Sequence, residues 1–535
     1  MSSVAADTVS TYTRPVLDRK PSRSTVILFL VLAAIGVGYT TFSLVGDINS
    51  AMPHGLTLLP FLLLGVALLI ALGFEFVNGF HDTANAVATV IYTHSLAPPV
   101  AVVYSGTLNF LGVVLSSGAV AFGIITLLPV ELILQVGSSA GFAMVFALLI
   151  AAIIWNLGTW WLGLPASSSH TLIGSIIGVG IANALMHGRD GTSGVDWGQA
   201  SKVGWSLLIS PVVGFICAAV LLLVLKSLVK NRALYQEPKG NRAPPWWIRG
   251  ILILTCGGVS FAHGSNDGQK GMGLIMLILI GIVPTAYALN RAMPASQMVP
   301  FIAIAKTTQQ SLGQYVQGPS PADPRAVLSS YIRTHTWNDE VLPALKSLTG
   351  SIAEQVKASG SFAKVPAAMV TNVRNDMYLT SEAVRVLNKD RHNVVLNAET
   401  RGNLNAFKKE IDLATKFIPL WVKVAVAIAL GLGTMVGWKR IVVTIGERIG
   451  KTHLTYAQGA SAEVVAMATI GAADMFGLPV STTHVLSSGV AGTMAANGSG
   501  LQMSTVRNLL MAWVLTMPAA IVLAGLLYYF FHQIF

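Results

Sequence analysis

The fold class is decided by residues 132–188, which read LILQVGSSAGFAMVFALLIAAIIWNLGTWWLGLPASSSHTLIGSIIGVGIANALMHG and contain no Asp, Glu, Lys or Arg. Residues 83–130, just upstream, also lack these four residue types. A transmembrane α-helix needs only about 20 predominantly apolar residues, and the core of a soluble protein does not require uncharged runs of this length. These two stretches therefore predict several membrane-spanning helices.

The composition of the whole chain agrees with a membrane protein. Only 11% of the 535 residues are charged and 53% are hydrophobic, with a mean hydropathy of +0.65, whereas soluble domains carry charge on about a quarter of their residues. Such a chain cannot cover a water-facing surface, which excludes a soluble enzyme, a nucleic-acid-binding protein and a secreted disulfide scaffold. We predict an all-α polytopic membrane protein with ten to twelve membrane elements and no cofactor.

The N-terminus is predicted to be a cytoplasmic tail, residues 1–24, followed by a first transmembrane helix. Residues 25–45 carry no charge, and this stretch is too long for the apolar region of a signal peptide. Cys217 and Cys256 lie in apolar segments without a metal or redox motif around them. We therefore interpret both cysteines as small core residues.

Short basic loops predict the orientation of the chain. Residues 226–249 and 438–451 are rich in Lys and Arg, which accumulate in cytoplasmic loops. Residues 291–415 hold 24 of the chain's 57 charges and are interpreted as a soluble, helical insertion outside the cytoplasm. Residues 25–290 would then contain the first helix, a first repeat and the start of a second repeat, which residues 416–535 complete.

Two pairs of motifs repeat along the chain in the same order. Residues 78–86 (NGFHDTANA) and 263–271 (HGSNDGQKG) each have an aspartate with a glycine three residues before it and polar residues one before and three after. Residues 163–170 (GLPASSSH) and 477–484 (GLPVSTTH) form the second pair. Internal repeats are typical of secondary transporters, so the motifs predict a duplicated transporter.

The aspartates of the first pair, Asp82 and Asp267, lie in apolar segments beside glycines that can let a helix break. An ionised Asp at the centre of a membrane helix costs about 2.5–3.5 kcal/mol. One such residue could simply be satisfied by a neighbouring helix, but two at matching positions indicate a function. We therefore predict that they bind a coupling cation or proton.

The hydroxyl clusters of the second pair predict an anion site. Each cluster follows a Gly-Leu-Pro turn and should begin a short helix, whose backbone N–H groups and dipole attract anions such as phosphate. A single cluster would be read as helix capping, whereas two clusters at matching positions favour a substrate site near the middle of the membrane. The predicted phosphate-binding residues are Ser167, Ser168, Ser169, Ser481, Thr482 and Thr483.

The two halves differ in a way that bears on the coupling ion. A dianion beside two carboxylates is repelled unless a cation or proton neutralises them, which predicts symport. Asn85 could coordinate a cation through its carbonyl oxygen, but the matching Lys270 cannot, because its ammonium is itself a cation. This difference argues against two symmetric sodium sites and favours proton coupling, with Lys270 paired to Asp267 or to the substrate.

Other polar residues in apolar segments are secondary candidates. Glu75 lies two turns before Asp82 and could relay a proton, while Glu463 and Asp474 near the second hydroxyl cluster are weaker candidates. Histidines beside the motifs are as often structural as proton carriers, and no structural metal site is predicted. The secondary site residues are Glu75, Asn78, His81, His263 and Asn266.

These four motifs resemble those of the PiT family of inorganic phosphate transporters over nearly the whole chain, most closely the bacterial low-affinity branch. His81 and Lys270 stand where Asn is common in the family, which is similar to its proton-linked members. The resemblance implies two inverted repeats with re-entrant Ser/Thr-rich hairpins, phosphate bound between them, a bacterial inner-membrane location and a homodimer. It also implies that a divalent cation can be carried with phosphate as a neutral complex.

Several other functions remain open at the level of sequence. A sulfate or other oxyanion permease could use the same scaffold, and phosphate symport could be driven by sodium. An intramembrane hydrolase could pair Ser169 with His170, or Thr483 with His484, although no third orienting group is evident. A channel or sensor would need neither of the two aspartates for stoichiometric coupling.

Overall fold

The computed structural model describes residues 14–17, 23–52, 56–82, 84–128, 130–135, 137–238, 240, 242–316, 318–389 and 396–534. These residues form helices and contain no strand, so the prediction of an all-α polytopic membrane protein is confirmed. Most of the predicted cytoplasmic tail, residues 1–24, lies outside the described residues.

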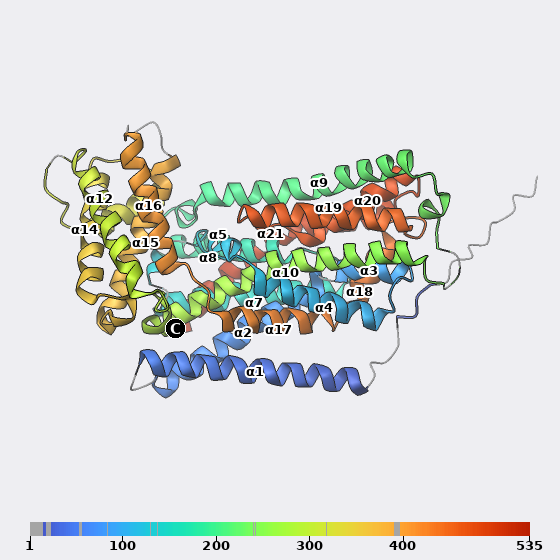
Figure 1. The fold of residues 1–535 in the computed structure, drawn as a ribbon, viewed down its shortest axis with the longest axis horizontal. Helices are drawn as coiled ribbons and strands as arrows, with labels where there is room; N and C mark the ends of the chain where they lie inside the picture. The colour runs from blue at the N-terminus through green and yellow to red at the C-terminus, as the bar shows by residue number, and fades with distance from the viewer. Residues whose placement is uncertain are drawn as a thin grey trace, which may run out of the picture.

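Within the described residues, seven helical segments are long and apolar enough to cross a membrane, with α2 and α3 taken as one. A bent pair, α16 and α17, meets at 67° and would provide an eighth. Three further helices, α10, α19 and α20, lie alongside them in the same bundle (Figure 1). The bounds are α1 (Arg23–Ala51), α2 (Leu58–Asp82), α3 (Ala84–Tyr92), α4 (Pro98–Leu115), α7 (Ser139–Trp161), α8 (Ser168–Met186), α9 (Trp197–Leu228), α10 (Trp246–Ile282), α16 (Ala398–Thr415), α17 (Leu420–Thr434), α19 (Tyr456–Met475), α20 (Thr482–Asn497) and α21 (Met503–Ile534). The predicted ten to twelve membrane elements are reached only when α10, α17, α19 and α20 are counted with the seven.

Helices of each half pack on helices of the other half, in matching pairs. Helix α4 packs on α10 while α17 packs on α2, and α9 packs on α20 while α21 packs on α8. Helices α9 and α21 both have 32 residues and one internal proline, Pro211 and Pro518. This pairing agrees with a duplicated chain, and the inversion of one repeat relative to the other stays a prediction.

Helix α10 differs from the expectation of a break near Asp267, because it runs without interruption for 37 residues. Its glycines allow close packing rather than a bend. A Cβ atom on Gly264 would lie 2.2 Å from the backbone oxygen of Asn109 in α4. In the first half, α2 ends at Asp82 and α3 begins at Ala84.

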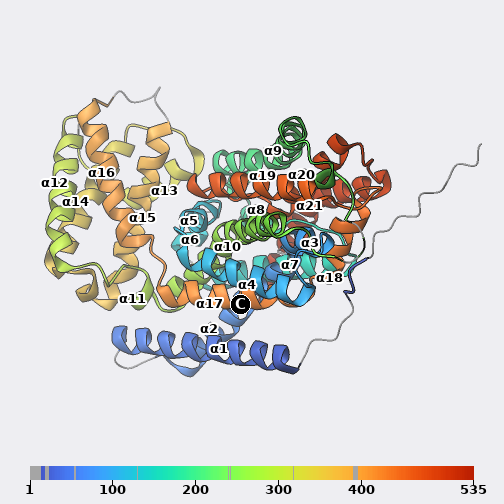
Figure 2. The same cartoon turned by 45° about the vertical axis from the view of Figure 1, so that its right-hand side comes forward.

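The insertion gathers at one end of the bundle (Figures 1 and 2). It consists of α12 (Met298–Gly313), α13 (Pro324–Thr334), α14 (Val341–Ser359), α15 (Ala367–Lys389) and α16, and it has its own apolar cluster around Leu328, Tyr331 and Leu345. Shorter connecting helices are α5 (Ala119–Ile125), α6 (Val130–Leu134), α11 (Pro284–Tyr287) and α18 (Lys439–Val443).

Charged side chains attach the insertion to the membrane bundle. Arg385 of α15 lies 2.8 Å from Asp196, the residue before α9, and Arg333 of α13 lies 3.0 Å from Glu131 of α6. Burial raises the pKa of Asp196, but Arg385 and the backbone N–H of Gln199 outweigh it and lower the pKa overall. The Asp196 carboxylate is therefore stabilised in its charged form.

Close packing between α8 and α21 depends on Gly178, where a Cβ atom would lie 2.2 Å from the backbone oxygen of Ile521. We expect Gly178→Ala to lower the free energy of unfolding by about 1–3 kcal/mol, because the helices must separate. Thermal unfolding in detergent measures this loss. Gly204→Ala in α9 is the matched control: apart from the adjoining turns of its own helix, nothing in the described part of the chain lies within 4 Å of the added methyl, so this variant should not destabilise the protein.

The attachment at Asp196 should depend on pH. Because the folded-state pKa is lowered, its stabilisation is present at neutral pH and is lost as the pH falls below about 4. We expect Asp196→Asn to lose about 1–3 kcal/mol at neutral pH and to release the insertion to proteases. Equal cleavage of the variant and the native chain at pH 7 would contradict this assignment.

Candidate functional site

The two Gly-Leu-Pro turns meet inside the bundle. Gly163 and Gly477 take φ values of +67° and +63°, which favour glycine after the last turn of a helix. Ser167 and Ser481 then cap α8 and α20, accepting the backbone N–H groups of His170 at 3.2 Å and His484 at 3.1 Å. The tips of the hairpins therefore bring two helix N-termini together.

A hydrogen bond joins the two tips directly. The Ser169 hydroxyl, at the start of α8, donates to the backbone oxygen of Val480 at 2.7 Å. Asp267 lies beside this junction and is the 22nd residue of α10, about 32 Å from the start of that helix and about 22 Å from its end. The tips therefore lie at depth in the bundle, as expected of re-entrant hairpins.

The structure brings Asp82 and Asp267 together through one hydroxyl group. The Ser168 hydroxyl lies 2.5 Å from Oδ2 of Asp82 and 3.3 Å from Oδ2 of Asp267. Both aspartates are buried, so neither faces lipid. Two aspartates 185 positions apart in the chain thus share one hydroxyl inside the protein.

The carboxylate of Asp82 receives hydrogen bonds from both halves of the chain. Nδ1 of His81 lies 2.8 Å from its Oδ1, and the Thr483 hydroxyl donates to the same oxygen at 2.8 Å. The Asn85 amide donates to the backbone oxygen of Asp82 at 2.8 Å and to the Thr483 hydroxyl at 2.9 Å. Asn85 therefore connects the first aspartate motif to the second hairpin.

The carboxylate of Asp267 is paired with a cation. Nζ of Lys270 lies 2.7 Å from its Oδ2, and Nε2 of His263 lies 3.5 Å from the same oxygen. Lys270 also donates to the Ser169 hydroxyl at 2.5 Å. Lys270 thus connects the second aspartate motif to the first hairpin, just as Asn85 reaches the second hairpin.

The predicted hydroxyl residues fall into groups with different partners. Ser167 and Ser481 cap helices, whereas Ser168, Ser169 and Thr483 bond to the aspartates, to Lys270 or to a backbone oxygen. Thr482 is buried, and within the described residues its hydroxyl has no hydrogen-bond partner. Three of the six hydroxyls therefore line the aspartate site, and a fourth is buried at the tip of the second hairpin.

Two aspartates and a histidine of the site lie close enough together to hold a cation. One ligand atom from each of Asp82, His263 and Asp267 lies within 4.8 Å of the other two. Carboxylate oxygens suit hard cations and protons, and an imidazole nitrogen accepts either. Lys270 already places one positive charge at this group.

The secondary candidates have mostly structural contacts. The Asn266 amide donates to the backbone oxygen of Leu478 at 3.1 Å and its Oδ1 accepts the Val480 N–H at 3.4 Å. His81 and His263 use their other ring nitrogens on Thr159 and Asn109. Thr159 was missed in the sequence because one threonine in an apolar helix carries no distinguishing pattern.

The geometry does not support the hydrolase alternative. The Ser169 hydroxyl donates to Val480 and the Thr483 hydroxyl donates to Asp82, so neither is directed at its neighbouring histidine. The ring centroids of His170 and His484 lie 4.6 Å apart with the rings tilted by 38°, and both rings line a groove of about 660 Å³ with Trp513. These histidines do not form a nucleophile–base pair.

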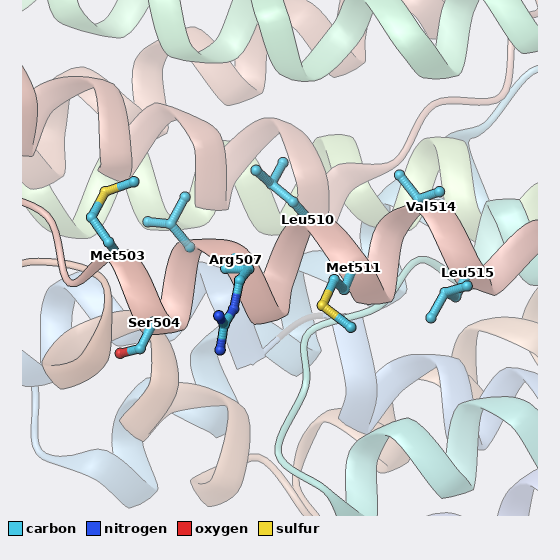
Figure 3. Close-up of a pocket in the computed structure, with 8 residues that line it drawn as sticks. Met503, Ser504, Arg507, Leu510, Met511, Val514 and Leu515 are labelled. Atoms are coloured by element: carbon cyan, nitrogen blue, oxygen red, sulfur yellow. The ribbon is translucent and has the colours of Figure 1, made fainter.

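A second groove, of about 780 Å³, follows the surface of α21 (Figure 3). Met503, Leu510, Met511 and Val514 are exposed along it, and Arg507 is its only charged side chain. None of the predicted site residues lines this groove. Its exposed apolar side chains suit contact with lipid chains.

Comparison with known proteins identifies the family. Residues 78–524 match the model of the PHO4 phosphate transporter family. The chain belongs to the phosphate transporter family. It is 43% identical over 496 residues to the low-affinity inorganic phosphate transporter PitA of Escherichia coli K12, covering 89% of this chain and 98% of PitA. It is 41% identical over 502 residues to PitB of the same strain, covering 90% of this chain and 99% of PitB.

Membership in this family confirms the resemblance seen in the motifs and the expectation that the chain is not an enzyme. A solved structure titled "The sodium-dependent phosphate transporter" covers 88% of this chain at 19% identity with a TM-score of 0.49. A likeness at that level carries no information on the coupling ion of this chain.

The contacts of Asn266 suggest a test of how the second hairpin is held. We expect Asn266→Ala to lower the free energy of unfolding by about 1–3 kcal/mol, because a backbone N–H and a backbone oxygen lose their partners. Asn497→Ala is the control, since its amide bonds only to Ser499 near the end of α20. If both variants melt at the same temperature in detergent, Asn266 does not hold the hairpin.

Proposed function

We propose that the protein imports inorganic phosphate by proton symport. The observation that carries the proposal is the Ser168 hydroxyl at the tip of the first hairpin, which is shared between the buried aspartates of α2 and α10. The relatives PitA and PitB are named inorganic phosphate transporters. The site provides what such transport requires: helix N-termini that attract anions, beside carboxylates that can bind a proton or a cation.

Competition for hydrogen-bond donors explains how charge on the aspartates can control phosphate binding. While Asp82 is ionised, the hydroxyls of Ser168 and Thr483 donate to it. Phosphate oxygens need the same donors. Once Asp82 gains a proton or a cation, it accepts these bonds less strongly and the hydroxyls can turn to phosphate. Neutralisation also removes the repulsion between the carboxylates and the dianion.

Lys270 is the reason to favour protons over sodium in the second half. Its ammonium pairs with Asp267 and donates to Ser169. Lys270 stands at the position of the second repeat that matches Asn85 in the first, and unlike Asn85 it has no oxygen to offer to a cation. Asp82, His263 and Asp267 remain able to accept protons or one cation. Sodium-coupled transport and a co-transported divalent cation with phosphate are the alternatives for this step.

The proposed direction follows from the basic loops. Arg14 lies 3.6 Å from Glu447, and the His453 N–H donates to Glu237 at 2.8 Å. These contacts bring the N-terminal segment and both basic loops to one side, which we propose is the cytoplasm. The insertion would then face the outside of the bacterial inner membrane. A homodimer is carried over from the family resemblance.

The decisive experiment is phosphate uptake into proteoliposomes with proton, sodium and magnesium gradients imposed one at a time. We expect a proton gradient alone to drive uptake, and a pure sodium dependence would contradict the proposal. Excess sulfate should not compete with labelled phosphate, because sulfate has no titratable proton at neutral pH. Strong competition by sulfate would favour an oxyanion permease.

Removing either carboxyl charge should stop the cycle. We expect Asp82→Asn and Asp267→Asn to lower uptake roughly a hundredfold or more, which corresponds to about 3 kcal/mol, while the proteins still insert. Ser175→Ala is the control, because that hydroxyl only bonds to Thr171 one turn back in α8. Uptake by either aspartate variant at the native rate would remove that residue from the mechanism.

A further inference from the structure

A third buried carboxylate shares the interface that holds the two aspartates. Glu75 of α2 lies on the same helix face as Asn78 and Asp82, three and seven residues later. On α10, Lys270 and Gly271 share a face with Asp267. Glu75 is completely buried, and Nδ2 of Asn78 lies 3.4 Å from its Oε2. The α2–α10 interface therefore carries three acidic side chains rather than two.

Gly271 provides the space for this carboxylate. A Cβ atom at this position would lie 2.3 Å from Oε1 of Glu75 and 2.6 Å from its Cδ. No side chain other than hydrogen fits between Glu75 and α10 without moving one of them. Gly271 lies one helical turn after Asp267 on α10. The carboxylate of Glu75, on the neighbouring helix α2, is therefore placed beside that turn.

The charges in this interface do not balance. Glu75, Asp82 and Asp267 contribute three negative charges when ionised, and Lys270 contributes one positive charge. His81 and His263 add charge only when protonated. Among the other helices packed on α2, α7 has no Asp, Glu, Lys or Arg, and the single lysine of α17, Lys423, donates to the backbone oxygen of Ser116. Neither helix therefore supplies a counter-charge for Glu75.

The position of Glu75 along α2 indicates the side from which it exchanges protons. It lies about 10 Å from Asp82 along α2, and Gly271 lies beyond Asp267 in the direction in which α10 runs towards the insertion. In the orientation proposed above, Glu75 is on the outer side of the phosphate site. Within the described residues, no hydrogen bond joins it to the hydroxyls that we assign to phosphate.

We propose that Glu75 is a third proton-carrying residue, which accepts a proton from the outer side before phosphate is carried inward. This inference rests on the proposed function and adds a proton to the transport stoichiometry. One proton binds to one carboxylate oxygen of Glu75, and the charge of the Glu75 side chain changes from −1 to 0. Lys270 keeps its ammonium. On release towards the cytoplasm the O–H bond breaks and the carboxylate is restored.

The test compares two activities of the same proteoliposomes. Phosphate–phosphate exchange needs no net proton movement, whereas net uptake driven by a pH gradient does. We expect Glu75→Gln to lower the ratio of net uptake to exchange at least tenfold, and to lower the number of protons taken up per phosphate, measured with a pH dye. A native ratio and a native proton count in Glu75→Gln would overturn the inference.

Matched variants separate this role from a loss of folding. Asp376→Asn is the control, since Asp376 is a buried carboxyl of the insertion that pairs with Arg325, away from the α2–α10 interface; its ratio should stay native. Gly271→Ala should displace Glu75 and lower the ratio as Glu75→Gln does, whereas Glu75→Asp should retain part of it. If Glu75→Gln fails to insert, a native ratio in Gly271→Ala overturns the inference. Absence of phosphate uptake by the native protein would instead contradict the proposed function.

Discussion

Carboxylates are energetically costly to place in the interior of a membrane bundle, and this cost constrains the rest of the structure. Asp82 and Asp267 are buried, and each charge must be compensated by hydrogen-bond donors or by a cation. The protein supplies these compensating groups from both halves: Ser168 from the first hairpin, Thr483 from the second, and Lys270 from α10 itself. The aspartates and the hydroxyls are therefore joined in one network of hydrogen bonds and an ion pair.

Close helix packing makes this arrangement possible. The hairpin tips can meet only because Gly163 and Gly477 adopt the left-handed conformation that ends α7 and α19. Small residues elsewhere let α8 and α21 approach, and Gly271 leaves room for the carboxyl group of Glu75. Backbone geometry therefore sets the distances between groups whose chemistry comes from their side chains.

Much of this could be predicted from the sequence, and the reasons for the rest are physical. The uncharged runs fix the fold class, and the repeated motifs identify Asp82, Asp267 and the hydroxyl clusters. The sequence could not show that α10 is unbroken, because a glycine beside Asp267 serves either a bend or a close contact. It also could not show that Ser167 and Ser481 cap helices while Ser168 bridges two aspartates. Neighbouring serines have the same chemistry, and only the direction of each side chain distinguishes them.

The salt bridge between Arg385 and Asp196 has a consequence for observing the protein at work. Asp196 caps α9, α9 packs on α20, and α20 begins beside the Thr483 hydroxyl that contacts Asp82. A continuous series of packing and polar contacts thus runs from the aspartates to the helices of the insertion. Tilting of the second hairpin would be transmitted to the helices of the insertion. The distance between those helices and α1 would then change. A pair of fluorophores on α14 and α1 would then report the alternation of the carrier without a label near the substrate.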